Sequence, residues 1–178
     1  MAVTFNDKAN PKIETKNLSL YADVGTSTSP EWELQGRGIA NWNFEENADV
    51  EKETDVLGMV DMERGTPQRA ISGIEMKFRK DHKLGAMIFE AWYSGDYSAL
   101  NALKILVVYG FVDGSSTDDG SFLAAQEDDV LIGVNSVSAE AGGYITADID
   151  INFANKRTLG TAKVGSNGTI TFTANSAA

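Results

Sequence analysis

Several segments of the chain alternate between apolar and polar residues with a period of two, and this pattern constrains the fold more than any other feature. The segments are 40–45, 74–79, 144–153 and 169–173. Because successive side chains of a β-strand point to opposite faces, such alternation is typical of a strand with one buried face. The apolar members of the longest run are Ile145, Ala147, Ile149, Ile151 and Phe153. We therefore predict a mainly β protein.

Turn residues separate these runs. Glycines at 142–143 divide an apolar run at 130–138 from the one that begins at Tyr144, and an Asn-Gly pair at 167–168 precedes the last run. Both are hairpin signals, so we expect an antiparallel meander in the last third of the chain. The run 105–109 is apolar on both faces, which predicts a central strand.

One segment has a helical period instead. Its apolar residues recur at i, i+3, i+4, i+7 and i+8, as on one stripe of an amphipathic helix. The stripe consists of Leu84, Met87, Ile88, Ala91 and Trp92. We predict a helix over about residues 82–93, with Asp81 as its N-cap and Gly95 as its stop. The expected fold is an antiparallel β-sandwich or barrel with one flanking α-helix and a long protruding hairpin.

The length of 178 residues suits a single domain. We place this domain at 13–173, between an N-terminal arm at 1–12 and a C-terminal tail at 174–178. No apolar run is long enough to cross a bilayer, so we expect no membrane partner. The first residues lack the basic and apolar parts of a secretion signal, which favours folding in a cytoplasm.

Residues that enzymes and metal sites need are scarce. The chain has no cysteine and one histidine, His82, which excludes disulfides, thiolate catalysis and cysteine-based zinc sites. We interpret His82, between Asp81 and Lys83, as a surface residue. Neither a Gly-x-Ser-x-Gly elbow nor a glycine-rich phosphate loop occurs. We predict no catalytic, cofactor-binding or metal-binding residues and no enzymatic activity.

Acidic residues are abundant, and the formal net charge is −11. A chain this acidic repels nucleic-acid phosphates, so we expect no specific binding to DNA. Acidic groups that stand together are Glu45-Glu46, Asp118-Asp119 and 127–129. Glycosidases use paired carboxylates and calcium sites use clustered ones, but neither spacing is evident here. We interpret these groups as solvated loop charge.

A long connection at 45–68 joins two predicted strands and far exceeds a tight turn. The charge is acidic up to residue 63 and basic over 64–83, a segregation that favours contact between copies of the chain. The middle of the connection is too apolar for a solvated linker. We predict an extended hairpin whose apolar residues require a partner surface. These residues are Val56, Leu57, Met59 and Val60.

The order of these features resembles that of a known family. The chain presents WNFE at 42–45, TDVLG at 54–58, SGIEMKF at 72–78, the helix, and glycine-punctuated strands ending in GTITF at 168–172. This order resembles the major tail tube protein of long-tailed bacteriophages, especially the non-contractile kind from Gram-positive hosts. The resemblance covers nearly the whole chain and rests on element order and texture. The acidic stretch 113–129 is long for the pattern.

The resemblance implies a non-enzymatic virion protein that forms six-fold rings. The rings would stack into a hollow tube through which DNA passes without specific binding. The hairpin at 45–68 would make ring-to-ring contacts through Val56, Leu57, Met59 and Val60, together with the terminal arms. Asp148 and Asp150 are the candidate acids of the lumen.

The implied partners are further copies of the chain and the tape-measure, tail-terminator and baseplate proteins, with no cofactor. The implied location is the virion tail, after assembly in the host cytoplasm.

Three alternatives stay open. A ring-forming tube protein of a bacterial secretion system would share this fold. A monomeric carbohydrate-binding sandwich would need an exposed aromatic platform, for which Trp32 with Tyr21 or Trp42 are the candidates. A hydrolase would use one of the acidic pairs. Ordered self-assembly would favour the tube, and glycan binding by a monomer would favour the sandwich.

Overall fold

A computed structural model describes residues 17–26, 29–36, 39, 42–47, 50–54, 56–57, 59–114, 120–139, 141–165 and 168–175. The predicted N-terminal arm at 1–12 lies outside these residues. Of the predicted tail at 174–178, Ala174 is the last residue of a strand and Asn175 follows it.

Each predicted alternating run and the predicted helix overlaps an element of the structure. The strands and helices are β1 (Leu18–Asp23), β2 (Trp32–Gln35), β3 (Asn43–Asn47), β4 (Val50–Thr54), β5 (Val60–Arg64), β6 (Gln68–Lys77), α1 (Lys83–Ser94), the 3-10 helix η2 (Ser98–Leu100), β7 (Leu103–Asp113), β8 (Ser121–Ala139), β9 (Ile145–Asn152), β10 (Lys156–Val164) and β11 (Ile170–Ala174).

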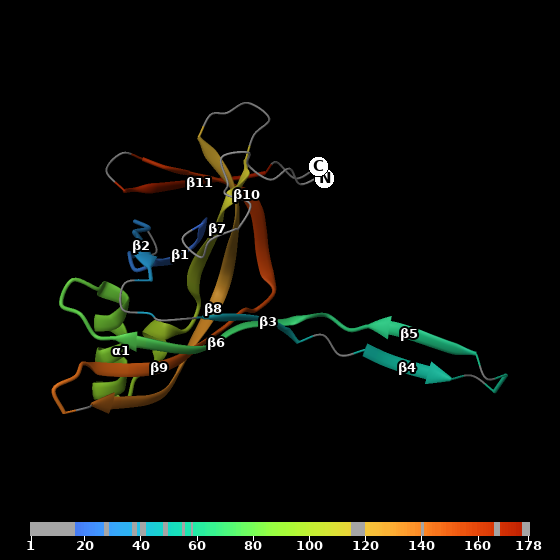
Figure 1. Cartoon of the computed structure of the whole chain (residues 1–178), viewed down its shortest axis with the longest axis horizontal. Coiled ribbons are helices and arrows are strands. Elements are labelled where there is room, and N and C mark those ends of the chain that lie inside the picture. The colour runs from blue at the N-terminus through green and yellow to red at the C-terminus, as the bar shows by residue number, and fades with distance from the viewer. Residues whose placement is uncertain are drawn as a thin grey trace.

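One antiparallel sheet of nine strands forms the body, with the main order β2-β1-β7-β8-β9-β6-β3. Strand β8 is 19 residues long and serves both halves of the body. Its first part pairs with β10 and its second part with β9. Asp129, with φ of 54°, lies between the two parts. The halves cross one another in Figure 1, where β7 and β8 run upright and β6 and β9 run sideways.

The predicted meander is therefore wrong in one connection. The chain leaves β9 and returns to the other half of the body, where β10 pairs with β8 and β11 pairs with β10. Within the acidic stretch 113–129, Asp113 ends β7 and the residues from Ser121 onward belong to β8. Alternation within a strand reports its faces but not its neighbours, which is why the order of pairing was missed.

The main core lies between the two halves of the body and α1. Alternate residues of β7 point to different cores: Ile105 and Val107 face the main core, while Leu106 and Val108 face a second, smaller one. This confirms the predicted central strand, since β7 is paired on both sides, with β1 and β8. The second core is completed by Tyr21, Ala124, Ala162 and Ile170.

Helix α1 buries Leu84, Ile88 and Ala91 of the predicted stripe. It ends at Gly95, whose φ of 73° is the left-handed conformation that glycine adopts most readily. The predicted N-cap is wrong: His82 occupies that position, and the Asp81 carboxylate instead accepts a hydrogen bond of 3.1 Å from Arg79.

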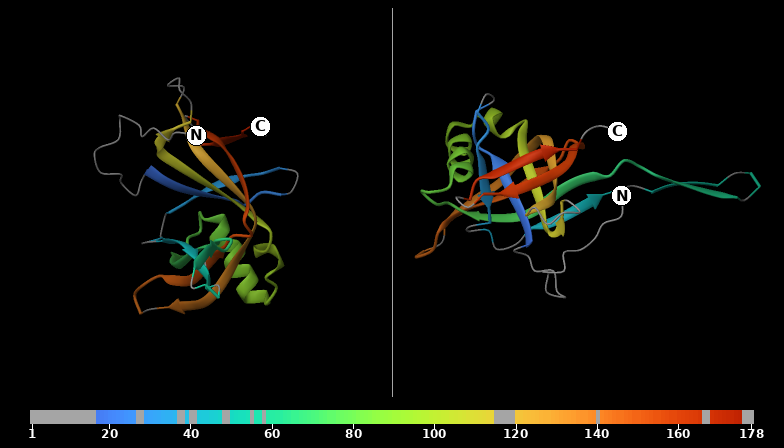
Figure 2. Two further views of the ribbon diagram at one scale, coloured as in Figure 1. Left: turned by 90° about the vertical axis from the view of Figure 1, so that its right-hand side faces the viewer. Right: turned by 90° about the horizontal axis from the view of Figure 1, so that it is seen from above.

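Strands β4 and β5 form a separate two-stranded ribbon that projects from the body, as Figures 1 and 2 show. With the antiparallel sheet and the flanking helix, this confirms the predicted fold class. Within the described residues, no helix has the length and apolar character needed to span a membrane.

Candidate assembly surfaces

The β4–β5 hairpin carries apolar side chains at its tip. The two strands pair from Val50↔Arg64 to Thr54↔Val60. Val56 is 102% exposed, Leu57 81% and Met59 67%. Val60 is the first residue of β5, and its side chain lies outside the described part of the structure. A contiguous exposed apolar tip on a protruding ribbon is typical of a contact surface.

The outer face of β9 carries both predicted lumen acids. Asp148 and Asp150 are half-buried, while the intervening residues Ala147, Ile149 and Ile151 point into the main core. Asp148 lies opposite Glu75 of β6 in the pairing register, so these two acids share a face of the sheet. Glu75 was not among the predicted acids, although its polar position in the alternating run 74–79 indicated this face.

Asp150 is held by two hydrogen bonds. Its Oδ1 accepts one of 3.2 Å from the Gly73 amide, and its Oδ2 accepts one of 2.8 Å from Asn135 Nδ2. The register of β6 against β9 shifts between Ile71 and Ile74, and Gly73 in this bulge has φ of 65°. Asp150 therefore satisfies a backbone donor at the bulge in addition to contributing negative charge.

A buried carboxylate joins three strands at the base of the hairpin. Glu127 of β8 is 1% exposed and accepts hydrogen bonds of 2.7 and 3.3 Å from the guanidinium of Arg69, near the start of β6. Arg157, opposite Glu127 on β10, donates a further one. The interpretation of 127–129 as solvated loop charge is therefore wrong for Glu127. It lies within a strand and faces the core side, as Ile105 does.

Burial and the nearby Arg69 charge shift the pKa of the Glu127 carboxyl in opposite directions. Burial raises the pKa of its carboxyl above the ordinary value, and the hydrogen bonds and charge of Arg69 offset part of that rise. Tyr109 of β7 lies close enough to respond: burial, and then the charge of Glu127, raise the pKa of its hydroxyl. Arg69 is 12% exposed and Arg157 33%, so the cluster is most enclosed on the hairpin side.

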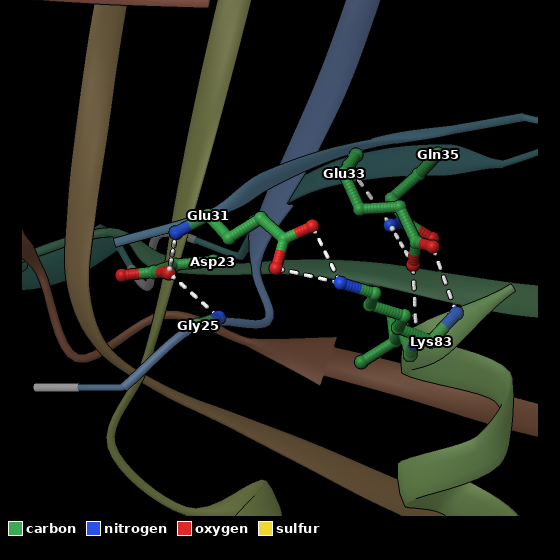
Figure 3. Close-up of polar contacts among 7 residues, drawn as sticks. Asp23, Gly25, Glu31, Glu33, Gln35 and Lys83 are labelled. Carbon is green, nitrogen blue, oxygen red and sulfur yellow. Dashed lines mark hydrogen bonds and ion pairs between the residues drawn. The ribbon is translucent and has the colours of Figure 1, made fainter. Parts of the chain in front are cut away.

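Glu33 of β2 fixes the start of α1. Its carboxylate accepts hydrogen bonds of 2.7 Å from the Lys83 amide and 2.9 Å from the Leu84 amide (Figure 3). This satisfies backbone donors that the first turn of a helix leaves free, as an N-cap side chain does. The Lys83 side chain also pairs with Glu31 at 2.6 Å.

The interpretation of His82 as a surface residue is wrong, because the side chain is 5% exposed. Its Nε2 is 3.5 Å from Glu33 Oε2, within ion-pair range, yet neither ring nitrogen makes a hydrogen bond with acceptable geometry. His82 lies just before Leu84, the first buried residue of the helix, and beside the carboxylate of Glu33. The neighbours of His82 in the sequence gave no signal of this contact with β2.

The α1 end of the body exposes aromatic side chains. Phe89 is 44% exposed, Trp92 46% and Tyr93 80%. The buried stripe of the helix is narrower than predicted, which leaves Trp92 at its margin rather than in the core.

The carbohydrate-binding alternative would need an exposed aromatic platform, and its candidate residues are largely packed on the two cores. Tyr21 is 6% exposed and packs with Trp32 on the second core, whereas Trp42 packs on the main core. These aromatics therefore lie in two separate cores. Of the acidic pairs, Asp118-Asp119 lies outside the described residues, and Glu45 accepts hydrogen bonds from Asn43 and Ser72. Among the residues that the structure describes, no three potential ligands lie close enough to hold a metal ion.

No family model matches the sequence, and no curated protein matches it either. Solved structures do resemble it. The sheath/tube terminator of an extracellular contractile injection system (PVC), in the extended state, is 8% identical with a TM-score of 0.53. The match covers 84% of this chain and 97% of that one. The tube-terminating cap of the anti-feeding prophage is 12% identical with a TM-score of 0.50, covering 88% and 96%. The chain thus shares the fold of a sheath/tube terminator and of a tube-terminating cap.

Proposed function

We propose that the protein is a structural subunit of a phage tail or a phage-tail-like tube. In this role six copies form a ring, and rings stack into a hollow conduit for DNA. Its partners are further copies of itself and the tape-measure, terminator and baseplate proteins at the tube ends. The observation that carries the proposal is the β4–β5 hairpin, which holds the exposed residues Val56, Leu57 and Met59 away from the body.

The body offers what ring closure requires. Among the described residues, β2, β3 and β11 each pair with a strand on one side only. Unpaired edges are an aggregation hazard in a monomer, and a closed ring of neighbours removes that hazard. In a ring whose β9 face lines the channel, Asp148, Asp150 and Glu75 present negative charge to the passing genome. Repulsion between carboxylates and phosphates lets DNA slide without sticking.

Negative-stain electron microscopy of the concentrated protein, with light scattering beside it, tests the proposal. Six-fold rings and hollow tubes are the expected result. The paired substitution Leu57→Asp with Met59→Asp is expected to leave folded rings that do not stack, since both side chains are largely exposed in the subunit and a charge at the tip opposes burial against another copy. Circular dichroism checks the fold of this variant. Normal tubes from it would remove the hairpin from the interface.

A second candidate is a cap that closes such a tube rather than extending it, and the resemblance to a tube terminator and a terminating cap favours it. A cap presents its hairpin to the tube but offers no surface for a further ring. Single rings that never stack at high concentration, yet bind the end of a preformed tube, are the result expected for a cap.

A further inference from the structure

We propose that the α1 end of the body receives the β4–β5 hairpin of a second copy, so that copies join head to tail. The inference rests on the proposed stacking role of the hairpin and names the surface that the hairpin contacts. We define the α1 end by its exposed apolar residues together with nearby basic residues. The apolar residues are Phe89, Trp92, Tyr93, Tyr144 and Ile145, and the basic residues are Lys77, Arg79 and Lys80.

The aromatic residues of α1 form one continuous patch. The ring of Phe89 stacks on that of Tyr93 at 6.3 Å between centroids, with 11° between their planes. The same ring lies 5.8 Å from Trp92 and 5.8 Å from Phe78, which follows β6. Phe89, Trp92 and Tyr93 remain between 44% and 80% exposed. A helix face that presents three aromatic rings to solvent resembles the centre of a protein interface, where such residues are enriched.

The sheet exposes further apolar side chains at this end of the body. The Phe78 amide donates a hydrogen bond of 2.9 Å to the carbonyl of Ile145, which joins the residue after β6 to the start of β9. Ile145 is 50% exposed and Tyr144 61%. The ammonium of Lys77 lies 5.3 Å from the centre of the Tyr144 ring. The α1 end therefore combines apolar area with positive charge.

The hairpin and the α1 end lie at opposite ends of the molecule. In Figure 1 the hairpin extends to the right, while α1 and the turn between β8 and β9 lie at the left. The view from above in Figure 2 gives the same arrangement. When copies stack along this axis in one direction, the tip of one meets the α1 end of the next. Such a contact is heterologous, and repeating it builds a stack rather than a closed dimer.

The two ends are complementary in charge as well as in apolar character. Residues 45–63 contain eight acids against one base, Lys52. Residues 77–83 contain four bases against one acid. Lys83 and Arg79 pair with acids of their own subunit, whereas Lys80 is exposed and Lys77 lies over Tyr144 on the outer face of the sheet. The most acidic segment therefore meets one of the few basic segments of an acidic protein, which favours the head-to-tail orientation over its alternatives.

Site-specific cross-linking tests the contact without background, because the chain has no native cysteine. One variant carries Leu57→Cys and an affinity tag that changes its size, and a second carries Tyr93→Cys. The two are mixed and treated with a short bis-maleimide. Leu159→Cys replaces Tyr93→Cys in the matched control, since Leu159 on β10 is also exposed, at 58%, but lies outside the α1 end. Both target side chains are exposed, so these substitutions leave the fold intact.

The expected result is a covalent heterodimer of the 57 and 93 variants, formed about tenfold more than that of the 57 and 159 variants because contact raises the effective concentration. Equal yields of the two heterodimers would overturn the α1 end as the receiving surface. So would the absence of any heterodimer in samples in which microscopy shows stacked rings. Both outcomes would leave the proposed function standing. A heterodimer in samples that never form rings would overturn the proposed function and keep the head-to-tail contact. Neither heterodimer nor rings would overturn both.

Discussion

The body and the hairpin are consecutive in the chain, but the body buries its apolar side chains and the hairpin exposes those at its tip. In the body, Ile74 of β6 is 1% exposed. At the hairpin tip Leu57 is 81% exposed, although only residues 65–67 separate β5 from β6. A two-stranded ribbon without a covering layer is at best marginally stable alone. The body therefore carries most of the folding free energy, whereas the hairpin leaves apolar side chains exposed.

The two regions meet at a fixed point. Arg69, next to the first residue of β6, is anchored on the buried carboxylate of Glu127. Its guanidinium also lies 6.0 Å from the ring of Phe153. The base of the hairpin is thereby held by charge and packing, whereas the apolar side chains at its tip are largely exposed.

The sharpest test of the comparison is to truncate one apolar side chain in each region. Ile74→Ala is expected to lower the free energy of unfolding by about 2–5 kcal/mol, since it removes buried methyl groups and leaves a cavity. Leu57→Ala is expected to change it by less than about 0.5 kcal/mol, as is usual for exposed sites. Chemical denaturation of the unassembled subunit measures both.

A second test acts on the junction. Arg69→Met removes the main partner of buried Glu127. It is expected to lower the free energy of unfolding by about 3 kcal/mol at pH 8. This value is near the lower end of the range for a broken buried ion pair, because Arg157 still bonds Glu127. Lys163→Met, an exposed change on β10, is the matched control and should cost under about 1 kcal/mol.

The pH dependence of Arg69→Met has a definite sign. Arg69 lowers the pKa of the Glu127 carboxyl, so its removal raises that pKa further above the unfolded value. A raised carboxyl pKa leaves stability intact below the unfolded pKa and removes it as the pH rises through the folded pKa. The gap between wild type and variant should therefore be larger at pH 8 than at pH 5. A gap independent of pH would mean that Arg69 acts through packing alone.

Much of the body could be predicted because its rules are local. The alternation of apolar and polar residues predicted β6 and β9, and the apolar stripe predicted α1. Each pattern arises because one face of the element packs on a core. The hairpin was also predictable, because Val56 and Leu57 stand in a connection too long for a turn and too apolar for a linker. Its role in stacking stays a prediction.

What escaped prediction depends on contacts between distant segments. Glu127 was taken for loop charge because nothing near it in the sequence reveals Arg69, 58 residues away. His82 was placed on the surface because Glu33, its neighbour from β2, is likewise remote. The return of β10 to β8 was missed for the same reason. Alternation states that a strand has a buried face and leaves open which strand lies beside it.

At the opposite end of the body from the hairpin, Glu33→Gln tests how α1 is fixed. The amide retains an acceptor but loses the negative charge beside the helix N-terminus, so we expect a loss of about 0.5–1 kcal/mol in unfolding free energy. Glu31→Gln is the control, because Glu31 meets Lys83 in an exposed pair that contributes little. Equal losses would mean that Glu33 acts only as another surface charge.

The smallest expected effect has the opposite sign. Asp148 lies across from Glu75 on the outer face of β9 and β6, and like charges directly opposite on a sheet destabilise it by about 0.2–1 kcal/mol. Asp148→Asn should therefore stabilise the isolated subunit by a few tenths of a kcal/mol. Asp150→Asn is the contrast and should lower stability, because the Asp150 carboxylate accepts a hydrogen bond from the Gly73 amide. Denaturation at low and high salt checks both, since screening should erase the gain but not the loss. If Asp148→Asn instead destabilises the subunit, the acid serves the fold. If it stabilises the subunit, the acidic face is retained at a cost to stability, as expected of a surface whose charge acts only in the assembled tube.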